Sequence, residues 1–195
     1  MQLSLEGLDA PATPTDRLFL ALFPPPEVAQ RIAAAWQLQR QALGLKGSLV
    51  DADRLHVTLM HLGDHPGLPP GLEASARQAA ATLAGRPGFE VCFDRLDNFR
   101  KGRDGHIQVL VGSDGAAALQ AFHRELSSAL QRAGLARWMD KRPGFTPHVT
   151  LQYSPQAAPA QAVEPMRWRV QGFVLVNSKL GRHQHQHLAH WPLQA

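Results

Sequence analysis

The tetrapeptide His-Val-Thr-Leu occurs twice in this chain, at residues 56–59 and 148–151. Successive side chains of a β-strand point to opposite faces, so each copy would present its histidine and threonine together and bury its two aliphatic residues. Two such strands side by side would bring two imidazoles and two hydroxyl groups to one surface. A neutral imidazole can accept a proton from an attacking oxygen while a protonated one donates to a leaving oxygen. Threonine hydroxyls can hydrogen-bond phosphoryl oxygens, so the set suits displacement at phosphorus and needs no metal.

Each tetrapeptide is also an ordinary strand sequence. Valine and threonine favour strands, and histidine is common on half-exposed ones, so a single copy is better explained by structure than by chemistry. The functional interpretation gains weight because both copies fall on predicted strands, each after a helix, at equivalent places in two halves of the chain.

The elements that would position the two tetrapeptides follow from hydrophobic periodicity and from glycine and proline stops. Helices are predicted over residues 27–44, 72–85 and 116–134, each ending at a glycine. Strands are predicted over residues 17–23, 55–62, 89–99, 106–112, 148–154, 167–180 and 187–193, with a Pro/Ala/Gln linker over 154–165. The order lacks strict strand-helix alternation, so we expect an α+β fold with two sheets and helices outside them.

Composition limits the class of protein. The 195 residues, 44% of them hydrophobic, predict one globular domain over residues 16–195 preceded by a flexible tail over 1–15. A net charge of +4 favours an anionic ligand but is too small to indicate a duplex-DNA binder. No apolar run is long enough for a membrane span and no secretion signal is evident, and Cys92 cannot form an internal disulfide, so a cytoplasmic location is expected.

Four stretches together resemble one protein family. They are DRLFLALFPPPEV (16–28), RLHVTLMHLGD (54–64), RPGFTPHVTL (142–151) and SKLGRHQHQHLAHWPL (178–193). In this order they are similar to the 2H phosphoesterase superfamily, which is named for two His-x-Thr-x motifs. More narrowly, they resemble the bacterial and archaeal RNA 2′,3′-cyclic phosphodiesterases, also called 2′–5′ RNA ligase-like proteins.

The resemblance implies a bilobal, pseudo-symmetric fold whose two antiparallel sheets line a central cleft. It implies hydrolysis of RNA 2′,3′-cyclic phosphate ends, or of small cyclic nucleotides, to 2′-phosphomonoesters, with 2′–5′ ligation as the reverse reaction. Carried over by motif, His56 would be the proton donor and His148 the proton acceptor, and Thr58 and Thr150 would hold the phosphate. No cofactor or metal is implied, and we expect a monomer.

Two positions depart from the family pattern. Tyr153 stands where family members often carry an arginine, so a cationic clamp on the phosphate is either missing or supplied by Arg54, Arg142 or Lys179. His185 stands where the closing strand usually carries an aromatic residue. The candidate substrate-binding residues are therefore Arg142, Tyr153, Phe23 and His185.

Two other functions remain open at this point. Alternate histidines over residues 183–187, with His190 beyond them, could bind a metal, although a solvated strand edge or cleft rim explains them better. The same scaffold could also serve a non-catalytic protein that binds RNA ends.

Overall fold

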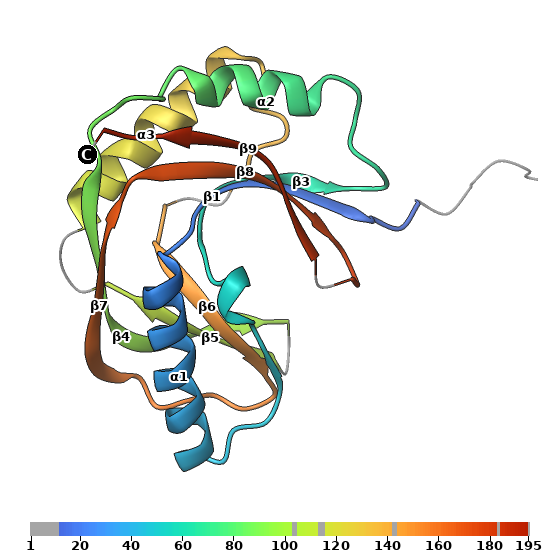
Figure 1. The fold of residues 1–195 in the computed structure, drawn as a ribbon. Coiled ribbons are helices and arrows are strands. Elements are labelled where there is room, and N and C mark those ends of the chain that lie inside the picture. Colours follow the sequence, from blue (N-terminus) through green and yellow to red (C-terminus); the bar gives the residue numbers. More distant parts are fainter. Residues whose placement is uncertain (1–11, 103–104, 113–115, 142–143, 183, 195) are drawn as a thin grey trace, which may run out of the picture.

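A computed structural model describes residues 12–102, 105–112, 116–141, 144–182 and 184–194 (Figure 1). The predicted tail over 1–15 lies mostly outside these ranges. The elements follow in the order β1 (Asp16–Leu22), α1 (Pro26–Ala42), β2 (Ser48–Leu49), a short 3-10 helix η1 (Ala52–Arg54), β3 (Val57–His65), α2 (Leu72–Ala81), β4 (Phe89–Lys101), β5 (Gly105–Val111), α3 (Ala116–Arg132), β6 (His148–Ser154), β7 (Gln161–Val170), β8 (Gly172–Lys179) and β9 (Gln184–Pro192). The predicted α+β class is confirmed.

Helix α1 shows how local sequence sets the elements. The ring of Pro26 fixes φ near its helical value, which suits the first helical position. Pro24, two residues after the end of β1, cannot donate a ladder hydrogen bond, so the strand does not continue through it. Val28, Ile32 and Trp36 recur at helical spacing and are buried. The helix ends before Gly44, whose φ of 64° is a left-handed conformation that glycine adopts without strain.

The strands form one nine-stranded sheet in the order β7-β4-β5-β6-β3-β1-β8-β9, with β2 attached to β6. Its pairings between neighbouring strands are antiparallel. The two separate sheets that we expected are therefore replaced by two halves of one sheet. These halves meet between β3 and β6, where the only register partners are Val57 and Val149, hereafter the valine pair. Both valines are completely buried, and burial of this shared apolar contact brings the strands together.

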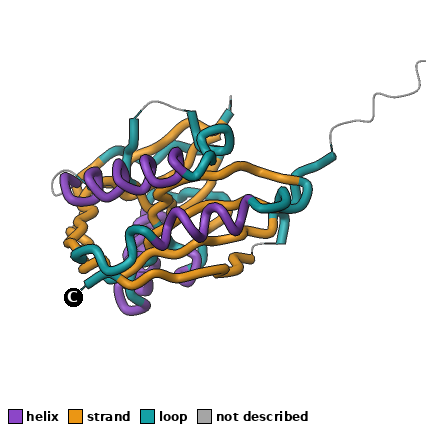
Figure 2. Tube along the Cα trace, turned by 90° about the horizontal axis from the view of Figure 1, so that it is seen from above, coloured by secondary structure: helices purple, strands orange, loops and turns teal. Residues whose placement is uncertain are grey.

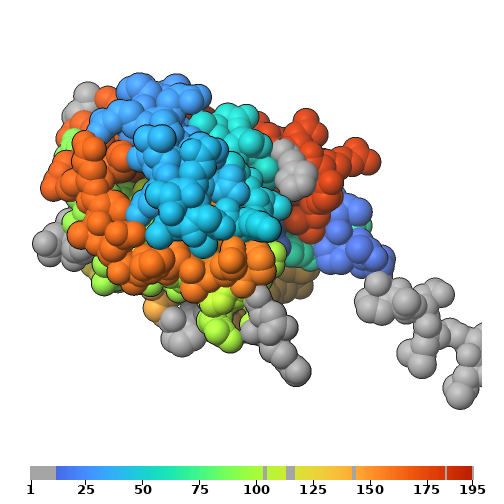
Figure 3. Space-filling model, turned by 90° about the horizontal axis from the view of Figure 1, so that it is seen from below, coloured from blue at the N-terminus to red at the C-terminus, as the bar shows by residue number. Residues whose placement is uncertain are grey.

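Helices cover the two halves on different sides. Figure 1 shows α2 and α3 over the half built from β3, β1, β8 and β9, and α1 beside the half built from β7, β4, β5 and β6. Figure 2, seen from above, shows α2 and α3 lying next to each other across the strands. From below, α1, the segment after it and β7 form one continuous surface (Figure 3). Each of α1 and α3 leaves a strand of one half and packs with the other half, which ties the halves into one body.

The prediction that residues 154–165 form a linker is partly wrong. Strand β7 begins at Gln161 and contains Pro165, although alanine, glutamine and proline are poor strand formers. The strand lies at the edge of the sheet, where the missing N–H of a proline can face outward without breaking the ladder.

Across the described segments, the structure contains no helix with both the length and the apolar character that a membrane span requires.

Candidate active site

The two His-Val-Thr-Leu motifs lie next to each other, since the first begins at His56, one residue before β3, and the second opens β6. The strands are antiparallel at the valine pair, so the register, extended by one residue on each side, sets His56 toward Thr150 and Thr58 toward His148. The four polar side chains are half-buried, whereas the aliphatic residues between and after them are buried, so the predicted alternation is present in both motifs. The two motifs are related by a local twofold axis through the valine pair, and their four polar groups share one face of the sheet.

Both imidazoles are held in the same way. Nδ1 of His56 lies 2.7 Å from the carbonyl oxygen of Arg54, and Nδ1 of His148 lies 2.8 Å from the carbonyl oxygen of Thr146. A carbonyl can only accept, so each Nδ1 carries a proton and donates it. Nε2 is therefore the atom of each ring that can exchange a proton with a ligand.

His56 lies in an apolar corner of the site. Its ring stacks on Phe19 with centroids 5.0 Å apart, and lies 5.7 Å from Phe23 and 5.3 Å from His185. Burial lowers the pKa of His56 to about 4, an effect only partly offset by the hydrogen bond to Arg54 and reinforced by the positive charge of neighbouring groups. In the free protein at neutral pH this imidazole is neutral.

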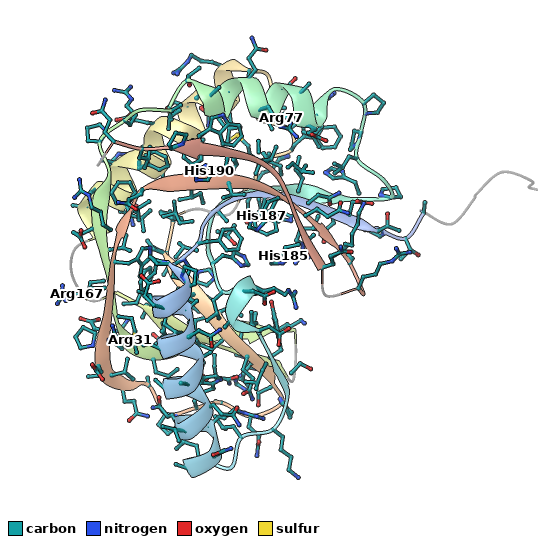
Figure 4. The ribbon with its side chains drawn as sticks, viewed as in Figure 1. Arg31, Arg77, Arg167, His185, His187 and His190 are labelled. Atoms are coloured by element: carbon teal, nitrogen blue, oxygen red, sulfur yellow. The ribbon has the colours of Figure 1, made fainter. Side chains whose placement is uncertain are left out.

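Two predicted substrate-binding residues lie beside His56. Burial, followed by the charges of His56 and Arg54, lowers the pKa of His185 to about 3, and Nδ1 of His185 has no hydrogen-bond partner among the described residues. The ring of Phe23 lies 4.6 Å from that of His187. Figure 4 shows His185 and His187 below β9, on the side of η1, while His190 lies apart from them. The sequence interpretation did not include Phe19, although its alternation with Phe23 along β1 placed both on one face.

His148 has a different environment. Its ring meets Phe99 edge-on, with centroids 4.8 Å apart. The segment before it is held by α3, because Nε2 of Gln120 donates to the carbonyl oxygen of Phe145 at 2.9 Å. The ring of His123 also stacks on Phe145 at 3.9 Å with an interplanar angle of 5°. Contacts from α3 therefore fix the backbone that orients His148, and sequence reasoning did not find this role for Gln120 or His123.

The three residues predicted as possible cationic partners of the phosphate differ in where they lie. The charge of Arg54 acts on the pKa of both His56 and His185, so its guanidinium lies near both rings. Lys179 is instead bound to the buried carboxylate of Asp16, so it does not fill the role of a phosphate clamp. Arg142 lies outside the described residues. Tyr153 is 38% exposed, and Nζ of Lys101 lies 4.4 Å from the centre of its ring.

The histidines of β9 were also considered as metal ligands. His183 lies outside the described residues. Within the residues that the structure describes, no three or more His, Cys, Asp or Glu side chains are grouped as a metal site.

Comparison with known proteins assigns the chain to a family. A model of the 2′-5′ RNA ligase superfamily matches residues 24–182. The chain belongs to this superfamily. No curated protein sequence matches the chain.

Solved structures share the fold over nearly the whole chain. A structure described as a phosphoesterase is 25% identical, with a TM-score of 0.71, and the match covers 94% of this chain and 100% of that one. The apo form of Escherichia coli LigT is 26% identical with a TM-score of 0.70, at the same coverage. TT0787 of Thermus thermophilus, at 24% identity and a TM-score of 0.70, covers 90% of this chain and 97% of its own. The chain therefore has a LigT-like fold.

Proposed function

We propose that this protein hydrolyses the 2′,3′-cyclic phosphate at RNA ends to a 2′-phosphomonoester, using two histidines and no metal. The observation that carries the proposal is the paired arrangement of two imidazoles, each with Nδ1 bound to a backbone carbonyl and Nε2 as the atom that can exchange a proton with the ligand. Membership of the 2′-5′ RNA ligase superfamily supports this chemistry. LigT has been crystallised with 3′-AMP and with phosphate, which supports a nucleotide ligand for the related site here.

The proposed reaction is an in-line displacement. Nε2 of His148 accepts a proton from water as the water oxygen bonds to phosphorus. The bond between phosphorus and O3′ breaks, and protonated Nε2 of His56 gives its proton to O3′. The hydroxyls of Thr58 and Thr150 donate to the non-bridging oxygens, where negative charge increases in the transition state. Proton exchange with solvent then restores the two imidazoles.

The donor role requires a proton that His56 lacks in the free protein, because its pKa is about 4. A phosphodiester anion bound against the ring favours the charged form and raises this pKa. In this proposal the bound anion thus favours uptake of a proton from solvent by His56, and the anion and the proton bind cooperatively. The rate should fall on both sides of a pH optimum, because one imidazole must be charged and the other neutral.

The test is turnover of a 2′,3′-cyclic nucleotide and of a short RNA with a cyclic end, in EDTA, with the product isomer identified by ³¹P NMR. His56→Ala and His148→Ala should each lower kcat by about 10²–10⁴-fold. His190→Ala, which changes an exposed histidine of β9, is the matched control. Undiminished turnover in either site variant would overturn the two-histidine mechanism, and loss of wild-type activity in EDTA would overturn metal independence. Binding of a cyclic end without turnover would favour the RNA-end binding protein instead.

A further inference from the structure

A strip of side chains leads away from His148 along the face of the sheet that carries the two motifs. Phe99 of β4, Ile107 of β5 and Tyr153 of β6 are register partners across three neighbouring strands, so their side chains share one face. Phe99 touches the ring of His148, which places this shared face on the side of the site. The strip therefore begins at Phe99, beside the proposed catalytic residue His148. It crosses from β4 through Ile107 of β5 to Tyr153 of β6.

Lys101 completes the strip at its outer end. It lies two residues beyond Phe99 on β4, and alternation places it on the same face. Its ammonium group is held over the ring of Tyr153, at 4.4 Å from the centroid. Both side chains are exposed, and no ion pair of Lys101 with a carboxylate is found among the described residues. The strip thus offers an aromatic ring that carries a positive charge over one face, and a base would pack on the remaining exposed part of that ring.

This combination matches one unit of a single-stranded nucleic acid. Aromatic rings stack on bases without regard to sequence, and a neighbouring ammonium attracts the phosphate. Lys179, the other lysine considered near the site, is already bound to Asp16. Lys101, whose ammonium lies over Tyr153, is in contrast available to a phosphate that lies beyond the two histidines.

We propose that the strip of Phe99, Ile107, Tyr153 and Lys101 binds the nucleotide immediately 5′ of the cyclic end, with its base on Tyr153 and its phosphate on Lys101. This inference rests on the proposed function, because it takes the cyclic phosphate to lie at His56 and His148. It identifies the preferred substrate as an oligoribonucleotide of at least two units, and it gives Tyr153 and Lys101 the task of distinguishing that substrate from a mononucleotide.

The test compares the affinities of adenosine 2′-phosphate and of the dinucleotide ApA with a 2′-phosphate end, measured by calorimetry at low and moderate salt. Wild type should bind the dinucleotide at least about tenfold more tightly. Tyr153→Ala and Lys101→Gln should each remove most of this advantage, and Tyr153→Phe should keep it. The affinity that is lost in Lys101→Gln should be the part of the wild-type affinity that decreases with added salt. Arg132→Gln, which removes one exposed charge from the end of α3, is the control for net charge.

Equal affinity of the wild type for the two ligands, or an advantage that survives both variants, would overturn the inference. Turnover of the matching cyclic substrates is measured in parallel. A dinucleotide advantage that depends on Tyr153 and Lys101, in a protein that turns over neither substrate, would support the strip and refute the proposed reaction. Turnover of both substrates with no dinucleotide advantage would support the proposed reaction and refute the strip as a binding site.

Discussion

The low pKa of His56 predicts a specific loss of stability on mild acidification. In the unfolded chain the imidazole titrates near its ordinary pKa of 6.5, whereas in the folded protein the pKa is about 4. Between these values the unfolded chain binds a proton that the folded protein excludes, so stability falls as pH decreases from about 6.5 and levels off near 4. At about 1.4 kcal/mol per unit, His56 should cost about 2 kcal/mol of unfolding free energy between pH 7 and pH 4.5.

His185 acts in the same direction, since its pKa is lowered to about 3 by burial and by the charges of His56 and Arg54. The His185 ring is partly exposed, so solvent screens its contribution, and wild type should lose somewhat more than the ~2 kcal/mol of His56 alone over this interval. The carboxyls of Asp16 and Asp64 do not interfere, because their pKa values are lowered from 3.8 to about 2 and their contribution disappears only below this window.

The assay is urea unfolding of wild type and His56→Gln at pH 7 and pH 4.5. On acidification the variant should lose about 2 kcal/mol less unfolding free energy than wild type. His190→Gln, at an exposed position of β9, should lose as much as wild type. An acid-induced loss in His56→Gln equal to that of wild type would refute the idea that His56 is kept neutral by its surroundings.

Two further predictions concern residues outside the motifs. His123→Ala should lower kcat for a cyclic nucleotide about tenfold or more with little change in KM, because the backbone that orients His148 loses its stacking partner. His123→Phe should restore kcat, so steady-state kinetics in which the two variants behave alike would contradict this positioning role. Asp16→Ala should lower the free energy of unfolding at pH 7 by about 2 kcal/mol, because the ammonium of Lys179 loses its partner in a partly buried position. Changing Lys179 to methionine in the Asp16→Ala background should recover part of that loss in urea unfolding, and a further loss would argue against an unpaired charge as the cause.

The face on which each motif presents its polar groups was predictable from the sequence because strand alternation is local. His56, Thr58 and the aliphatic residues beside them follow from a period of two, whatever the rest of the chain does. The helices were predictable for the same reason, since buried residues at helical spacing and terminal glycines lie within one short segment.

The surroundings of the histidines depend instead on contacts between distant parts of the chain. His185 and Phe19 reach His56 only because β9, β8, β1 and β3 are neighbours in the sheet. The sequence allowed Lys179 to bind the phosphate. The structure places it on Asp16 instead, which lies 163 residues away in the sequence. The adjacency of β3 and β6 could not be predicted from the sequence, because one valine pair is too small a contact to produce a recognisable sequence pattern.

Under the proposed function, the valine pair has a consequence for which of two isomeric products forms. The local twofold axis through it exchanges His56 with His148 and Thr58 with Thr150, so these four groups alone present almost the same surface to a cyclic phosphate in either of two orientations. Turning the substrate about this axis exchanges O2′ and O3′. If the proposed reaction holds, the choice between a 2′-phosphate and a 3′-phosphate product would fall to the unequal walls of the site, which are Phe19 with His185 on one side and Phe99 on the other. In the proposed reaction the histidines would then set the rate of cleavage, and the aromatic walls would select the bond that breaks.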